Sequence, residues 1–457
     1  MTETEICMIL DTYMYFDYQY AKDSEPLSKI IEGMEAHPEV ITSHPNEYEI
    51  LSRAVNHKEI GDLKIVCQSS DMGFDSGTNA AGFVSKDNKT VYIAFRGTAD
   101  GEWYDNGDGM TAQKTTQQKS AVSYFEKTAE KLQLGPRQHV ILTGHSKGGN
   151  KVQYITMETP MVDVIDRTYS IDGQGHSDAA LKRWNNMYTK EEFDSRVSKI
   201  YAVNGQNDFV SVLGLGLVLK EHISYVETPA GAMDFVTYHD ITGMFKKTNV
   251  EEDGAIRTEH SCRKNPNVLV RGKLSECVAA LSANIMSLPQ DERAGSALTL
   301  MQSIEFLNGG MRTGVNGETI GEDDIKTFVK CGVPAITKTI FGKDEGIDFV
   351  KGALTRNGYA PDMPATGVSI RVDYAAMTQL AQKMMHTSVS LHELTDDMIN
   401  AVLHVPLIID GVVYKQGKML ESIEKLRTYA DQMKKLAAIQ LGAANIYRSA
   451  DSTRICF

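Results

Sequence analysis

The sequence predicts an α/β domain followed by an all-helical segment, and three observations support this. In the first half of the chain, continuous apolar runs alternate with helical patterns. After about residue 250 the apolar runs stop, and helical patterns prevail. Beyond a Gly- and Pro-containing linker at 358–367, apolar residues recur with a period of about 3.5 residues, which is typical of a coiled coil.

Three apolar runs are the predicted strands of the first half: Val91–Phe95, His139–Thr143 and Val197–Val203. Continuous apolar runs are expected of strands that are buried on both faces. Between the first two runs, apolar residues three and four apart over 122–132 predict a helix. Strands alternating with helices predict a parallel sheet with right-handed crossovers.

The second half is predicted to be helical at 274–310 and 323–342, and again from 370 to 457. The last region contains two helices with a 3.5-residue repeat, separated by a segment with Pro406 and Gly411 that can reverse the chain. The predicted domains are therefore 1–250 (α/β), 251–365 (a helical connector) and 366–457 (a helical hairpin). A plain dimerising coiled coil is the alternative for the hairpin.

The composition argues against several classes of function. The 457 residues include 47 Lys and Arg against 60 Asp and Glu, for a net charge of −13. This balance argues against nucleic acid as a partner and against adhesion to anionic membranes through bulk charge. The N-terminus (MTETEICMIL) is acidic where a secretory signal peptide is basic. The six cysteines are scattered and none forms a C-x-x-C pair, so we expect no metal site and no cofactor.

The most informative motif is Gly144-His145-Ser146-Lys147-Gly148, a G-x-S-x-G pentapeptide. An apolar strand runs directly into it, and a helix-compatible segment, 151–157, follows. A strand–turn–helix elbow of this kind exposes the serine hydroxyl at the end of an α/β-hydrolase sheet. Ser146 is therefore the predicted nucleophile.

A serine nucleophile needs a histidine base, which in turn needs a carboxylate to orient it. In α/β-hydrolases the chain order is Ser, acid, His, and ligand sites lie at the carboxyl ends of the strands. Asp208 follows the run that ends at Val203 and is the favoured acid. Asp172, also past a strand, is the competitor, although its D-G-Q-G setting resembles a turn.

For the base, His239 is favoured because it follows the predicted strand His222–Val226 and a Gly-containing loop. His222, at the head of that strand, is interpreted as structural. His145, next to the nucleophile, is expected to pack against the sheet.

The oxyanion of the tetrahedral intermediate needs hydrogen-bond donors. The backbone N–H of Lys147 and the N–H and hydroxyl of Thr98, just after Val91–Phe95, are the candidates. The polar stretch Ala99–Gln118 is either a lid or a long surface loop. The apolar run Val212–Leu219 is either the lining of an acyl groove or a buried segment.

These motifs resemble those of the class 3 lipases over residues 60–250. The F-R-G-[ST] motif with a later Trp and Asp corresponds to Phe95–Thr98, Trp103 and Asp105. Still closer is a lipase-like family of clostridial-type Firmicutes with a G-H-S-K-G-G-N motif, here Gly144–Asn150, and a D-G-x-G element, here Asp172–Gly175. Its E-H and later H-D elements correspond to Glu221-His222 and His239-Asp240, which supports His239 as the base.

The C-terminal hairpin is similar to the WXG/LXG-type hairpins of type VII secretion substrates. Tyr447 and Asp451 fit the Y-x-x-x-[DE] export signal of that system, although the W-x-G turn is absent. The order of domains resembles reverse-ordered type VII lipase effectors. That resemblance implies a secreted toxin with small helical partner proteins and an immunity protein.

Together these features predict a serine hydrolase that cleaves lipid or phospholipid acyl esters during transient membrane contact, without cofactor or metal. The alternative is a cytoplasmic esterase or thioesterase whose C-terminal helices only mediate oligomerisation.

Overall fold

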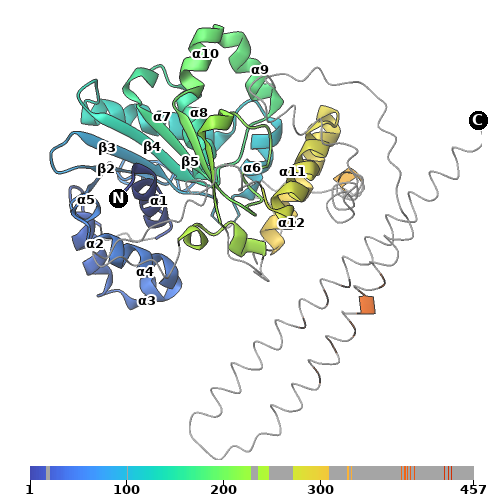
Figure 1. Cartoon of the computed structure of the whole chain (residues 1–457), viewed down its shortest axis with the longest axis horizontal. Helices are drawn as coiled ribbons and strands as arrows, with labels where there is room; N and C mark the ends of the chain where they lie inside the picture. The colour runs from blue at the N-terminus through green and yellow to red at the C-terminus, as the bar shows by residue number, and fades with distance from the viewer. Residues whose placement is uncertain are drawn as a thin grey trace, which may run out of the picture. The chain divides into compact units, whose positions relative to one another are not determined.

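A computed structural model describes residues 1–16, 21–99, 101–227, 235–245 and 271–307, and a few single positions between 327 and 434. The fold is α/β, as predicted: one mixed sheet of seven strands with helices against both faces (Figure 1). The strands lie side by side in chain order: β1 (Lys64–Val66), β2 (Ala80–Val84), β3 (Thr90–Phe95), β4 (His139–His145), β5 (Arg167–Ile171), β6 (Ile200–Gly205) and β7 (Ile223–Val226).

Strands β3 to β7 are parallel, whereas β1 and β2 add an antiparallel edge. The third predicted strand starts at Ile200 and not at Val197, because Val197 ends the preceding helix, where its side chain is fully buried. An apolar run alone could not separate the last residue of that helix from the strand.

The parallel strands are joined by α7 (Thr116–Leu132), α8 (Lys147–Glu158), and the pair α9 (Asp178–Met187) and α10 (Lys190–Val197). Right-handed crossovers between strands in sequential order place such helices on one face of the sheet. The packing agrees, since Val91, Ile93 and Phe95 of β3 contact the core formed with α7 and α8.

The alternate residues of β3, Tyr92 and Ala94, face the opposite side, where a second core forms. The first 61 residues supply the helices of this side: α1 (Glu3–Tyr13), α2 (Leu27–Met34), α3 (Pro38–Ser43), α4 (Pro45–Ala54) and α5 (Lys58–Gly61). In α1 a capping box from Thr2 and Glu5 fixes the first turn, and residues 5–13 are all buried. The N-terminal segment therefore forms one complete layer of the fold.

The stretch Ala99–Gln118 contains α6 (Trp103–Thr111) and the start of α7, so the interpretation as a long surface loop is wrong, whereas the lid stays a prediction. Six of the nine residues of α6 are buried, because α12 (Gln290–Leu307) packs along it (Figure 1). The helix α11 (Lys273–Met286) joins the same core. Thus the helical prediction for 274–310 is confirmed at 273–286 and 290–307, and both helices pack on the α/β layers.

The chain divides into two compact units, 1–364 and 365–457. Most of the second unit, including both repeats of the predicted hairpin except for a few single positions, lies outside the described residues, as does most of 323–342. Within the part of the chain that is described, no helix is both long and apolar enough to span a bilayer.

Candidate active site

The turn between β4 and α8 has the geometry of a nucleophile elbow. Ser146 lies between the strand and the helix with φ 58° and ψ −122°, a conformation that side-chain-bearing residues rarely adopt. Such strain, of about 1–3 kcal/mol, persists only where the surrounding structure enforces it, and it is concentrated at functional sites.

Glycines make the elbow possible. A β-carbon at Gly148 would lie 2.1 Å from the carbonyl oxygen of Phe95, and one at Gly144 would lie 2.3 Å from the carbonyl carbon of Gly148. Both contacts are with backbone atoms, which have no room to yield. The two glycines of the motif therefore allow the strand, the helix and β3 to approach one another closely.

The elbow brings together the three residues predicted as nucleophile, base and acid. The Ser146 hydroxyl lies 2.7 Å from Nε2 of His239, and Nδ1 of His239 lies 2.6 Å from Oδ1 of Asp208. With Nδ1–H donating to the carboxylate, Nε2 is the acceptor for the serine proton. Ser146 and Asp208 are 2% and 0% exposed, and His239 is 8% exposed, so the site is closed in this structure.

Asp208 is held by the loop that follows β6. Its Oδ1 also accepts the N–H of Val210 (3.2 Å), and its Oδ2 accepts the N–H of Ser211 (2.6 Å). His239 and these two backbone N–H groups together fix the orientation of the buried carboxylate before any substrate arrives.

His145 belongs to the same cluster and does more than pack against the sheet, the role expected from the sequence. Its ring stacks on that of His239, with centroids 4.7 Å apart and 27° between the planes. Its Nδ1 lies 2.5 Å from the hydroxyl of Tyr15, a residue just beyond α1. Burial, and next the neighbouring His239, hold the pKa of His145 well below its usual range. His145 is therefore a neutral ring beside the base.

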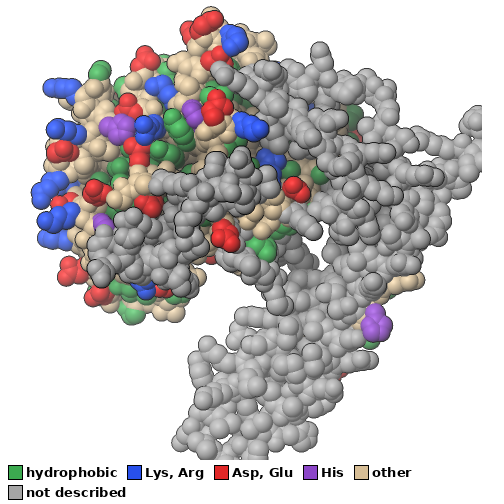
Figure 2. Space-filling view, in the orientation of Figure 1, with side chains coloured by type: hydrophobic (Ala, Val, Ile, Leu, Met, Phe, Trp, Pro, Cys, Tyr) green, Lys and Arg blue, Asp and Glu red, His purple; other side chains and the backbone are tan. Residues whose placement is uncertain are grey.

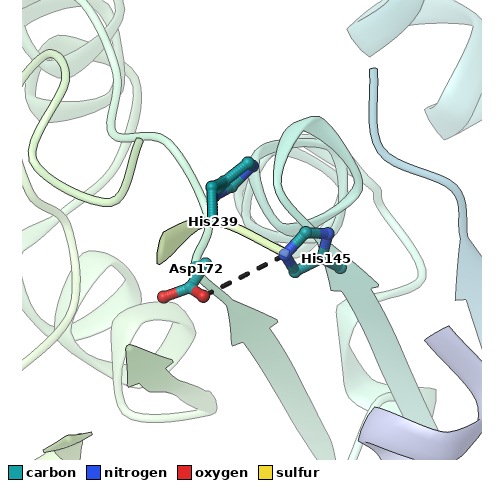
Figure 3. Close-up of side chains that lie close together, drawn as sticks. All are labelled: His145, Asp172 and His239. Atoms are coloured by element: carbon teal, nitrogen blue, oxygen red, sulfur yellow. Dashed lines mark ion pairs between the residues drawn. The ribbon is translucent and has the colours of Figure 1, made fainter. Parts of the chain in front are cut away.

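Asp172, the competitor for the role of acid, is also here. His145, Asp172 and His239 offer ligand atoms within 4.8 Å of one another (Figure 3). They do not form a ready metal site, because a metal must lie in the plane of each imidazole and the two rings are stacked. Both nitrogens of His239 are also engaged by Ser146 and Asp208. A metal would bind only if these hydrogen bonds broke.

Thr98 lies in the loop that leaves β3 at Phe95, as predicted for an oxyanion donor. Its Oγ1 accepts a hydrogen bond from Nδ2 of Asn106 (2.8 Å), a residue of α6. The hydroxyl proton of Thr98 takes no part in this bond, so Thr98 can donate it to another acceptor. The second predicted donor, the N–H of Lys147, is the first of α8, where helix N–H groups have no partner within the helix.

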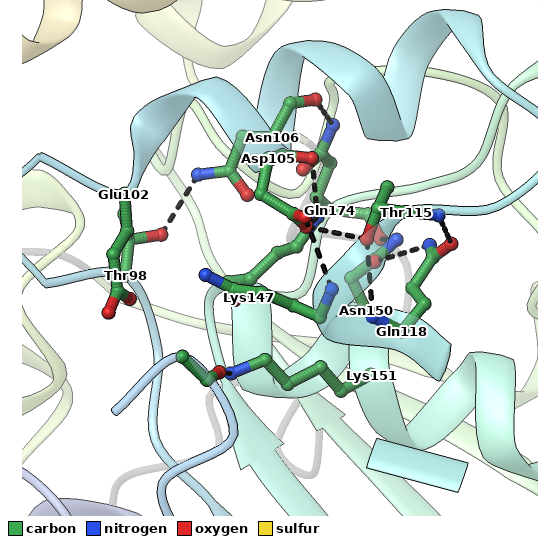
Figure 4. A network of polar contacts seen from close by, with 12 residues as sticks. Thr98, Glu102, Asp105, Asn106, Thr115, Gln118, Lys147, Asn150, Lys151 and Gln174 are labelled. Atoms are coloured by element: carbon green, nitrogen blue, oxygen red, sulfur yellow. Dashed lines mark hydrogen bonds and ion pairs between the residues drawn. The ribbon is translucent and has the colours of Figure 1, made fainter. Parts of the chain in front are cut away.

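A buried polar network ties α6 to the elbow (Figure 4). Nζ of Lys147 lies 2.7 Å from Oδ2 of Asp105 and donates to its backbone carbonyl (2.8 Å). Burial opposes ionisation of Asp105, but the charge and hydrogen bond of Lys147, with Thr115 and Gln117, lower its pKa. Gln174 reaches the same helix through the carbonyl of Asn106 (2.7 Å). The sequence did not mark these side chains as site residues, although Asp105 matches a family motif.

Lys151, one turn further along α8, fixes the start of the loop that carries Thr98. Its buried Nζ donates to the carbonyls of Gly77 (2.6 Å) and Arg96 (3.3 Å). Burial lowers its pKa to about 7. The loop that carries Thr98 is thus held both from α6 and from α8.

Other predicted residues lie elsewhere. The Nδ1 of His222 bonds the carbonyl of Ile200 (3.1 Å), and its ring stacks on Tyr201, in keeping with a structural role. The run Val212–Leu219 is mostly buried in a core with α11 and α12, which favours the buried-segment interpretation over an acyl groove. The proposed export residues, Tyr447 and Asp451, lie outside the described residues.

A cavity of about 560 Å³ lies beside α9, away from the triad residues. Three basic side chains line it, but each is already paired. Lys182 and Arg293 contact Asp178, and Arg183 contacts Glu158. Because Lys182 and Arg293 share one carboxylate, a single positive charge of the three is left in excess for an anionic ligand.

Comparison with known proteins adds one finding. Residues 57–245 match the model of a family described as Mbeg1-like. The matched part is under half of the chain, and it contains Ser146, Asp208 and His239 as well as Thr98. No curated protein matches the chain.

Proposed function

We propose that the protein is a serine ester hydrolase with an α/β-hydrolase domain, acting on acyl esters of lipids. The observation that carries this proposal is the continuous hydrogen-bond chain from Ser146 through His239 to Asp208, with distances of 2.7 and 2.6 Å. These are the distances at which a base can take a proton from a nucleophile.

In the first half-reaction, Oγ of Ser146 attacks the ester carbonyl carbon while Nε2 of His239 removes its proton. Asp208 stabilises the imidazolium through Nδ1–H and does not itself take the proton. The negative charge that forms on the carbonyl oxygen is bound by the N–H of Lys147 and by Thr98. His239 then protonates the leaving alcohol, and the C–O bond of the ester breaks.

In the second half-reaction, water attacks the acyl-enzyme with His239 again as base, and the fatty acid leaves as Ser146 recovers its proton. No cofactor or metal is needed for these steps. The network around Lys147 and Lys151 supports catalysis by keeping the two oxyanion donors in place, which matters because donors must be positioned before the charge forms.

A lipid substrate is supported by the resemblance to class 3 lipases. On the face shown in Figure 2, acidic and basic side chains of the described residues are interspersed, without a large patch of either sign. Transient membrane contact would then depend on apolar groups rather than on bulk charge.

The test compares the wild-type protein with Ser146→Ala, with Ser198→Ala as a matched control on an exposed helix end. We expect Ser146→Ala to reduce fatty-acid release from phospholipid or triglyceride vesicles by at least about 10⁴-fold, and to abolish labelling by a fluorophosphonate. The control should keep both activities. Equal release by the wild type and Ser146→Ala would refute the mechanism.

We also propose that the protein is a type VII-exported effector, with Tyr447 and Asp451 as the export signal and helical proteins as partners of the hairpin. This part rests on the sequence pattern alone. Deleting residues 446–457 should leave ester hydrolysis unchanged and stop export, so that the protein no longer accumulates in the medium of the cells that produce it. Unchanged export would favour the cytoplasmic esterase.

A further inference from the structure

A second carboxylate lies beside the triad and has no role in the mechanism above. Asp172 follows β5 directly, as Asp208 follows the neighbouring strand β6 by a short loop. It is fully buried, and its backbone has φ 47°, in the left-handed region that residues other than glycine seldom occupy. A fully buried acid in this conformation is uncommon, which makes Asp172 a candidate for a functional role.

Only one oxygen of Asp172 has a hydrogen-bond partner. Oδ1 accepts the N–H of Gly205 at 2.5 Å, whereas Oδ2 has no partner among the described residues. The backbone of Gly205 continues into the loop of Asp208, whose own N–H donates to the carbonyl of Gly205 (3.0 Å). Asp172 therefore holds the base of the loop that carries the acid.

The unpartnered oxygen faces the histidines. Oδ2 lies 4.0 Å from Nε2 of His145 (Figure 3), and a ring nitrogen of His239 is within 4.8 Å of the same carboxylate. Nε2 of His145 likewise has no hydrogen-bond partner in the part of the chain that the structure describes. A shift of about 2 Å would bring an Asp172 oxygen to hydrogen-bonding distance of His239.

The two acids differ in what surrounds them. Asp208 receives two backbone N–H groups in addition to His239, whereas Asp172 receives one backbone N–H. Burial, and next the charge of Asp208, raise the pKa of Asp172 well above its usual range. The other titratable groups that face this pair are His145, His239 and, behind His145, Tyr15. Burial and the neighbouring Asp208 thus both disfavour a charge on Asp172.

We propose that Asp172 is a positioning residue for His239, acting as a second acid of the site. In the intact protein it stays protonated and fixes the Asp208 loop through Gly205. When Asp208 loses its carboxylate, Asp172 releases its proton to solvent, becomes ionised and accepts the Nδ1–H of His239. The inference deepens the proposed function and rests on it, since it assigns a role relative to the catalytic base.

A double-mutant cycle tests this inference. Asp172→Asn keeps the size and the acceptor for Gly205 and imitates the protonated acid, so in the wild-type background we expect the labelling rate with a fluorophosphonate to change by less than about 3-fold. In the Asp208→Ala background the same change should cost at least about 10-fold, towards the roughly 10⁴-fold loss known when a triad acid is absent. A residue with a purely structural role would give the same factor in both backgrounds, and that result would overturn the inference.

A measurement that needs no turnover separates this inference from the proposed function. The proton between His239 Nδ1 and a carboxylate gives a low-field NMR signal, which His239→Gln identifies by removing it. We expect the signal to persist in Asp208→Ala and to vanish in Asp208→Ala/Asp172→Asn. Its loss in Asp208→Ala alone would refute the second acid, whatever the activity of the wild type.

Because Asp208→Ala also removes an acceptor for two backbone N–H groups, thermal unfolding of each variant is recorded. Asp208→Ser serves as the second variant, since its hydroxyl can still accept a local N–H. In the Asp208→Ser background, too, we expect Asp172→Asn to lower the labelling rate by a larger factor than in the wild type. If the factor equals the wild-type one in both the Asp208→Ala and the Asp208→Ser backgrounds, the proposed role of Asp172 is wrong.

Discussion

The family-matched residues, 57–245, and the residues that flank them contribute differently to the site. The matched part holds all three members of the hydrogen-bond chain and both predicted oxyanion donors. The flanking residues form helices that pack against the matched part. The segment 1–56 forms a helical layer against one face of the sheet, and α12 packs along α6.

Three residues of the flanks nevertheless form hydrogen bonds with residues close to the proposed triad. Tyr15, from beyond α1, bonds His145 beside the base. Glu305 of α12 accepts the N–H of Gly101 (2.8 Å) in the loop between Thr98 and α6. Asp11 of α1 accepts the hydroxyl of Thr143 on β4, three residues before Ser146. The comparison indicates that the matched part carries the three residues of the proposed triad, while the flanks stabilise the elements that bear them.

The largest effect is expected at the elbow itself, in the matched part. Gly148→Ala places a methyl group 2.1 Å from the Phe95 carbonyl, so it should destabilise the fold by at least about 3 kcal/mol and abolish fluorophosphonate labelling. Gly216→Ala is the control, because a β-carbon there meets nothing within 4 Å. Urea unfolding measures both. A Gly148→Ala protein as stable and reactive as wild type would show that β3, β4 and α8 can move apart with little loss of folding stability.

A smaller effect is expected at Thr98, the proposed oxyanion donor in the loop after β3. Thr98→Val removes the hydroxyl that Asn106 orients, and we expect kcat to fall by about 10²–10³-fold with little change in KM, because the donor acts mainly in the transition state. Thr98→Ser should recover most of the rate. If Thr98→Val raises KM and leaves kcat unchanged, the hydroxyl contacts the substrate and not the oxyanion.

The smallest effect is expected in the flank. Burial raises the pKa of Asp11 well above its usual range. As pH rises past the unfolded-state value of about 3.9, the unfolded chain releases this proton while the folded protein keeps it, so Asp11 lowers folding stability at neutral pH.

Asp11→Asn keeps the acceptor for Thr143 and removes the titration. We expect its melting temperature to exceed that of wild type at pH 7 and the difference to shrink towards pH 4, without loss of labelling. Asp163→Asn, at an exposed position, should show no such pH-dependent difference. An Asp11→Asn protein that is less stable at pH 7 would mean that the charge itself supports α1.

The sequence predicted the parts that depend on local pattern. Continuous apolar runs identified β3 and β4, and the Gly and Ser spacing identified the elbow at Ser146. Asp208 and His239 were placed by strand ends and chain order, and the structure brings both to Ser146. It did less well at Ala99–Gln118, where glycines and polar residues indicated either a lid or a long surface loop. Tertiary packing against α12 makes it a helix despite those residues.

What the sequence by itself determined is the order of the candidate residues along the chain: Ser146, then the proposed acid Asp208, then the proposed base His239, each after a strand. Only the tertiary structure decided which groups surround them. Tyr15, His145 and Asp172 come from distant parts of the chain and meet at the carboxyl ends of parallel strands. Their burial, and with it the raised pKa of Asp172, depends on layers that fold from both flanks. No local pattern encodes that burial, because the energy of a charge depends on everything packed around it.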